Sequence, residues 1–144
     1  MLEKYPTEVK LVHKFLPHVS EFSKKAAKAA MAADDQGKFW EFHGKVYENQ
    51  EELKLNATQG RSNDAKILEI AGLLKLDVKR FINKMDDPAF EELIDRDLND
   101  ARELDIRSTP QVYINGRVLK ERSFPGFVDA IDKELKREEE RDSK

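Results

Sequence analysis

Cysteine is absent from all 144 residues of the chain. Its absence excludes disulfide bonds, thiolate nucleophiles and metal sites built on thiolates. It leaves the compartment open, because a chain without thiols is compatible with any redox potential. These residues therefore supply no thiol chemistry of their own.

Long apolar runs are also missing. No stretch reaches the roughly 18 consecutive apolar residues that a transmembrane helix needs. The start of the chain is charged in a way that does not resemble a signal peptide, with Glu3, Lys4, Glu8, Lys10 and Lys14. As written, the chain is expected to stay in the cytoplasm.

Charge of one sign does not dominate either. Lysine and arginine number 26 and aspartate and glutamate 29, so the net charge is only −3 although 38% of the residues are charged. Such a balance provides no field that would attract nucleic acid or an anionic membrane. The sequence also lacks a glycine-rich phosphate loop and a basic aromatic stripe. We expect neither nucleic acid nor a membrane as a partner.

Residues 105–119 carry the clearest local pattern in the chain. Residues 112–114 are Val-Tyr-Ile, which favours a strand, and Val118-Leu119 resumes the apolar run. Between them lies Asn115-Gly116, the dipeptide preferred in a type I′ turn because both positions need a positive φ. Pro110 lacks an N–H and is tolerated where a strand opens. The segment predicts a β-hairpin.

The rest of the chain predicts one more strand and a series of helices. The strand covers Val9 to Phe15, where apolar and polar residues roughly alternate. We expect 55–61 to be a loop and 137–144 to fray into a charged tail. Helices are predicted at 21–34, at 38–49, from Ser62 or Asn63 to Leu74, from Asp77, from Asp87-Pro88 to Leu104, and from Phe124 onward. In the helix that starts at Asp77, we expect Val78, Phe81 and Ile82 to point inward.

The helix over 38–49 is rich in aromatic residues. Only Glu41 and His43 could supply polar groups to a ligand there, whereas a ligand site usually brings several convergent polar groups. We therefore expect these side chains to lie in the core: Phe39, Trp40, Phe42, Val46 and Tyr47.

Several motifs, in the same order along the chain, resemble the DsbA-like branch of the thioredoxin fold. They are Lys10 to Pro17, Gln36-Gly37-Lys38-Phe39-Trp40-Glu41-Phe42-His43, Leu74-Lys75-Leu76-Asp77, and Ser108-Thr109-Pro110 followed by the hairpin. The resemblance implies an α/β fold: one strand, four or five helices, a β-hairpin and a helix. It implies a single domain over 1–144, with a core at 8–17 and 105–136, a helical insertion at 20–104 and the tail at 137–144.

The start of the chain departs from the family pattern. Family members have a strand and a Cys-x-x-Cys helix before the segment that matches Val9 to Phe15, and they are usually exported or periplasmic. This chain is expected to be truncated there, with Leu2 to Pro6 as the remnant of that helix. The missing strand would lie between the strands of 9–15 and 112–114. We expect a homodimer to fill the gap; direct closure of the two strands, or folding back of residues 1–5, are the alternatives.

The resemblance also identifies a candidate site. In the family, the loop that matches Ser108-Thr109-Pro110 contains a cis-proline, faces the reactive cysteines and holds an extended peptide by its backbone. We therefore expect a peptide-binding site at Ser108, Thr109 and Pro110, although a purely structural turn is equally compatible with the sequence. We expect no catalytic residue and no cofactor in this chain.

No other residues of the sequence form a convincing site. His13, His18 and His43 fall on three different predicted elements without metal-ligand spacing. The acidic pairs Asp34-Asp35, Asp86-Asp87 and Glu91-Glu92 are better explained as helix caps and solvated faces. Two function classes remain: the C-terminal portion of a DsbA-like thiol:disulfide oxidoreductase, or a redox-inactive module that binds or assembles proteins through the same loop.

Overall fold

A computed structural model describes residues 2–17, 21–59 and 63–143. The contacts divide the chain into two compact units, which we treat separately. The hairpin unit comprises Met1–Lys14 and Ala101–Lys144, and the helical unit comprises Phe15–Asp100.

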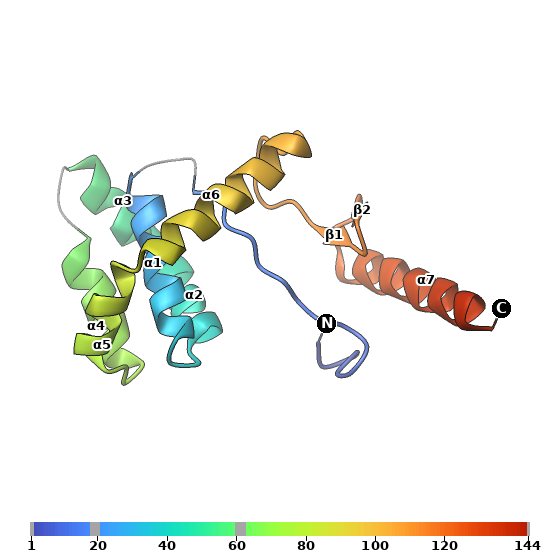
Figure 1. Ribbon diagram of the computed structural model, residues 1–144, viewed down its shortest axis with the longest axis horizontal. Coiled ribbons are helices and arrows are strands. Elements are labelled where there is room, and N and C mark those ends of the chain that lie inside the picture. Colours follow the sequence, from blue (N-terminus) through green and yellow to red (C-terminus); the bar gives the residue numbers. More distant parts are fainter. Residues whose placement is uncertain (1, 18–20, 60–62, 144) are drawn as a thin grey trace. The chain divides into compact units, whose positions relative to one another are not determined.

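The helical unit contains five whole helices and most of a sixth among its described residues (Figure 1). Helix α1 packs against α2, α4 and α5, and α4 also contacts α2 and α5. The bounds are α1 Glu21–Asp34, α2 Phe39–Glu48, α3 Gln50–Thr58, α4 Asp64–Leu73, α5 Val78–Met85 and α6 Pro88–Glu103.

The core of the helical unit forms where the alanine-rich face of α1 meets α2 and α5. Ala29, Ala32 and Ala33 are completely buried, and their small side chains allow neighbouring helices to approach closely. Phe42 of α2 and Phe81 of α5 are also completely buried, with ring centroids 5.5 Å apart. Removing each ring from water stabilises the unit by about 1.5–3 kcal/mol.

The helix starts at Asp77 and Asp87 are confirmed. The Asp77 carboxylate caps α5 by accepting a hydrogen bond from the Arg80 N–H at 3.0 Å. Asp87 precedes α6 and accepts one from the Ala89 N–H at 3.0 Å. At α4 the capping residue is Asn63, but its side chain is buried and donates to the Leu53 carbonyl at 3.1 Å instead of capping. The other candidate cap, Ser62, lies outside the described residues.

Two local predictions in this unit are wrong. Residues 55–58, predicted as loop, belong to helix α3, where the first-turn Glu51 pairs with Lys54. Val78 and Ile82, predicted to point inward, are 37% and 44% exposed, and only Phe81 of that set is buried. Of these three positions, α5 thus buries only Phe81.

The prediction that all the apolar side chains of α2 lie in the core is also wrong. Phe42 is completely buried, whereas Trp40 is 47% and Tyr47 61% exposed. Residues 40, 43 and 47 share one helical face, and α2 buries the opposite face against α1 and α4. The aromatic density of the sequence did not show that Trp40 and Tyr47 remain largely exposed.

The hairpin is confirmed in the hairpin unit. Strands β1 Tyr113–Ile114 and β2 Arg117–Val118 pair antiparallel, with Tyr113 opposite Val118. Asn115 and Gly116 have φ of 46° and 77°, as a type I′ turn requires. Helix α7, Phe124–Asp142, contacts β1. It continues through residues predicted to fray, because Glu, Lys and Arg favour helix and Glu134 pairs with Arg137.

The predicted strand from Val9 to Phe15 is absent from the described residues, where this stretch has no regular structure. The sheet there has only β1 and β2, so the stretch has no strand beside it and does not close on β1. A strand forms only against a partner, so the alternating pattern alone could not produce one. The N-terminal residues instead pack on α7: Tyr5 is 6% exposed and its hydroxyl donates to Asp132 Oδ1 at 2.6 Å.

The described residues thus form a mostly helical structure with one small sheet. Six helices precede the hairpin there, instead of the four or five predicted. None of the helices in this part of the chain is both long and apolar enough to cross a membrane.

Candidate functional site

The end of α6 directs the chain into the loop that the sequence singled out. Asp105 adopts a left-handed conformation, with φ of 51°. The Asp105 N–H donates to the Arg102 carbonyl at 3.1 Å and the Ile106 N–H to the Ala101 carbonyl at 2.8 Å. This pair of bonds closes the helix and turns the chain sharply away from its axis.

The loop itself lies at the surface. Ser108, Thr109, Pro110 and Gln111 are all exposed. The peptide bond between Thr109 and Pro110 is cis, the isomer that the resemblance implies. Within the described residues, no hydrogen bond involves Ser108 or Thr109, so their backbone groups are open to an incoming chain.

Arg122 fixes the loop from the other side of the hairpin. Its Nη1 donates to the Pro110 carbonyl. A tight turn after β2 brings it there: a Cβ on Gly126 would lie 2.3 Å from the Glu121 carbonyl oxygen, so only glycine fits. Ser123 then caps α7 by accepting from the Gly126 N–H at 3.2 Å. Sequence analysis missed Arg122, since nothing in the sequence sets it apart from the other arginines.

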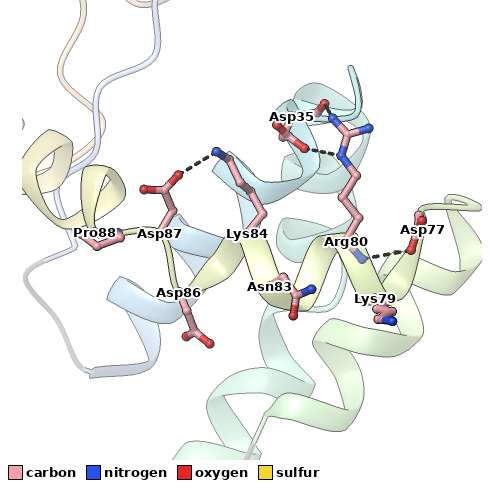
Figure 2. A pocket seen from close by; sticks show the side chains of 9 residues that line it. All are labelled: Asp35, Asp77, Lys79, Arg80, Asn83, Lys84, Asp86, Asp87 and Pro88. Carbon is pink, nitrogen blue, oxygen red and sulfur yellow. Dashed lines mark hydrogen bonds and ion pairs between the residues drawn. The ribbon is translucent and has the colours of Figure 1, made fainter.

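A shallow charged cleft of about 680 Å³ lies in the helical unit, between the end of α1, helix α5 and the start of α6. Figure 2 shows its two ion pairs. Arg80 Nε lies 2.7 Å from Asp35 Oδ2, and Lys84 Nζ lies 2.7 Å from Asp87 Oδ2. The first pair connects the end of α1 to α5, and the second connects the end of α5 to the start of α6.

The electrostatics of this cleft argue against catalysis. The hydrogen bond from Lys84 and that from the Ala89 N–H lower the pKa of Asp87. The same bond to Asp87 raises the pKa of Lys84. Both groups are therefore held in their charged forms at neutral pH, whereas a general acid or base needs a pKa shifted toward the working pH. We assign the cleft a structural role: Asp87 caps α6, as predicted, whereas Asp35 pairs with Arg80.

The three histidines lie in different parts of the chain. His13 and His43 belong to different units, and His18 lies outside the described residues. No group of three metal-ligating side chains of the His, Cys, Asp or Glu type occurs in the described part of the chain. His43 instead lies among rings, with centroids 5.8 Å from Phe39 and 4.8 Å from Tyr47. Burial lowers its pKa below 6.5.

Comparison with known proteins decides the family. The family described as Thioredoxin matches residues 1–133. The chain belongs to this thioredoxin-like family, in its DsbA-like branch. The assignment agrees with the exposed proline loop, the type I′ hairpin and the closing helix.

Three curated relatives are similar to this chain. The probable disulfide bond formation protein D of Bacillus anthracis is 31% identical over 121 residues, and that of Bacillus cereus 32% over 113 residues. Each match covers 78% of this chain and 50% of the relative, so the chain spans about half the length of these proteins. The Na(+)/H(+) antiporter NhaA 3 of Salinispora tropica is 34% identical over 113 residues, 77% of this chain and 16% of that protein.

Proposed function

We propose that these 144 residues form the C-terminal, substrate-holding portion of a DsbA-like thiol:disulfide oxidoreductase. In this proposal Ser108, Thr109 and Pro110 hold an extended peptide segment of the substrate. The observation that carries it is the exposure of Ser108 and Thr109, whose backbone groups have no hydrogen bond within the described residues. Backbone groups of this kind bind an extended chain by strand addition, largely without regard to its side chains.

The family membership and the names of the Bacillus relatives support disulfide chemistry for the whole protein. Thiol–disulfide exchange requires a thiolate that attacks one sulfur of a disulfide, forms a mixed disulfide and displaces the other sulfur as a thiolate. This chain has no sulfur nucleophile. By itself it would therefore bind a substrate segment without exchanging its disulfides.

A redox-inactive binding or assembly module is the alternative, and the complete lack of cysteine favours it. Sequencing the reading frame upstream of the first codon separates the two. A strand followed by a Cys-x-x-Cys helix in that frame supports the oxidoreductase. A stop codon in that frame, together with a stably folded 144-residue product, supports the binding module.

Peptide binding at the loop is testable by NMR on the full chain. A cysteine-free, uncharged octapeptide titrated into ¹⁵N-labelled protein should shift the amide signals of Ser108, Thr109 and Gln111. Arg122→Ala, which frees the Pro110 carbonyl, should weaken binding about threefold to tenfold through lost preorganisation. The matched control is Arg117→Ala, which removes an arginine of β2 that pairs with Glu134 instead. Shifts confined to other surfaces, or equal effects of the two variants, would contradict the site.

A further inference from the structure

Arg122 is held beside the proline loop by a single hydrogen bond. One N–H of its guanidinium donates to the carbonyl of Pro110, the residue that directly follows the open backbone groups of Ser108 and Thr109. Arg122 is exposed, and no other hydrogen bond involves its side chain in the described part of the chain. A guanidinium carries further N–H donors in a planar fork that matches a carboxylate. Most of these donors therefore remain available to a ligand at the loop.

Arg122 also lacks an acidic partner, unlike the two arginines that precede it in sequence. Arg107 Nε lies 2.8 Å from Asp105 Oδ1, and Arg117 Nε lies 3.1 Å from Glu134 Oε1. By contrast, no carboxylate of the described residues pairs with Arg122. Its charge is therefore directed at the loop without being balanced by an ion pair.

Lys120 adds a second positive charge to the same segment. It is exposed where the chain leaves β2, and no ion pair involves it among the residues that the structure describes. Glu121, which separates the two cations, pairs with neither of them. Its Oε1 instead accepts a hydrogen bond from the hydroxyl of Ser123, the cap of α7, at 2.6 Å. The segment from Lys120 to Arg122 thus keeps a net positive charge.

We propose that Arg122, assisted by Lys120, binds a carboxylate of the extended segment at the loop, so that the site prefers substrate segments that contain aspartate or glutamate. This inference rests on the proposed function, because the loop must hold a segment before Arg122 can contact its side chain. Strand addition at Ser108 and Thr109 fixes the backbone of the segment, and the fork of Arg122 selects the side chain. Hydrogen bonds between ionised partners are roughly twice as strong as neutral ones.

Three peptides that differ in one residue test this preference. Each is a cysteine-free octapeptide with blocked ends, uncharged except at its fifth residue, which is glutamate, glutamine or lysine. Titrated into the ¹⁵N-labelled full chain, all three should shift the amide signals of Ser108, Thr109 and Gln111, because they share the backbone contact. The glutamate peptide should bind about tenfold more tightly than the glutamine peptide, and the lysine peptide most weakly. Added salt should reduce these differences, since it screens exposed charges.

Substitutions on the protein identify the group that reads the charge. Arg122→Gln should bring the dissociation constants of the glutamate and glutamine peptides close to each other, and Arg122→Glu should make the lysine peptide the tightest of the three. Lys120→Gln should reduce the preference about twofold. The matched control is Arg117→Gln, which removes an arginine already paired with Glu134 and should leave the preference unchanged. Comparing peptides within one variant cancels any general weakening that a disordered loop would cause.

The outcomes separate this inference from the proposed function. Equal binding of the three peptides at the loop overturns the inference and leaves the proposed function intact. A preference for glutamate that persists in Arg122→Gln also overturns the inference, because another group then reads the charge. If none of the peptides shifts the signals of Ser108, Thr109 and Gln111, both the inference and the proposed function are wrong.

Discussion

The side-chain amide of Gln36 pairs with both backbone polar groups of Asp77. The Asp77 N–H donates to Gln36 Oε1 at 2.8 Å, and Gln36 Nε2 donates to the Asp77 carbonyl at 3.2 Å. The amide thereby exchanges two hydrogen bonds with one residue, as paired residues of neighbouring β-strands do. These bonds connect the end of α1 to the residue that caps α5. One side chain thus makes two hydrogen bonds to a residue 41 positions further along the chain.

Gln36→Ala removes both hydrogen bonds and should lower the free energy of unfolding by about 1–3 kcal/mol, since each bond contributes about 0.5–1.5 kcal/mol. Gln36→Glu retains the acceptor and loses the donor, so its effect should be intermediate. Urea denaturation measures both. The control is Gln59→Ala, at an exposed glutamine without a side-chain bond in the described residues. Equal losses for Gln36→Ala and the control would refute the role of the amide.

Tyr5 should make the stability of the chain sensitive to alkaline pH. Burial and the hydrogen bond to Asp132 raise the pKa of the Tyr5 hydroxyl above 10.0. Because the folded-state pKa is raised, the contribution of this hydroxyl to the free energy of unfolding is complete below pH 10. It is lost as the pH rises through the folded-state pKa. Tyr5→Phe should lower the melting temperature by a few degrees at pH 8 and reduce the alkaline loss. Tyr47→Phe, at a ring that is 61% exposed, is the control and should do neither.

His43 should act at the opposite end of the pH range. Burial lowers the pKa of His43 in the folded chain below its ordinary value of 6.5. At a pH between the folded-state and the unfolded-state pKa, the unfolded chain therefore binds more protons than the folded one. Its contribution to stability is therefore complete above pH 6.5 and decreases as the pH falls. Thermal melts between pH 7.5 and 5.5 should show a smaller acid loss for His43→Phe than for the wild type. An unchanged pH dependence in the variant would show that other groups cause the loss.

Disulfide chemistry should be absent from the isolated chain. We expect no reduction of insulin by dithiothreitol beyond the uncatalysed rate, and no oxidation of a dithiol peptide, at any pH where the chain is folded. The reason is the lack of any residue that can form a thiolate. A heat-inactivated sample is the control. Activity clearly above this control would reveal a reactive group that the sequence does not suggest.

Much of the local structure was predictable because it depends on neighbours in sequence. The caps at Asp77 and Asp87 and the turn at Asn115-Gly116 follow from side-chain hydrogen bonding and from permitted φ values. The motif around Ser108-Thr109-Pro110 led to the family, which the match over residues 1–133 shows. None of these inferences required knowledge of what lies across the fold.

The tertiary structure decided everything that depends on a distant neighbour. The sequence showed that α2 is rich in aromatic residues, but only packing showed that Phe42 is covered and Tyr47 is not. Alternation marked Val9 to Phe15 as a strand, yet the described residues place no strand beside it. The bond from Arg122 to Pro110 likewise depends on a turn that brings together residues 12 positions apart. Sequence patterns specify what a segment can bury or pair, and the fold determines whether a partner is within reach.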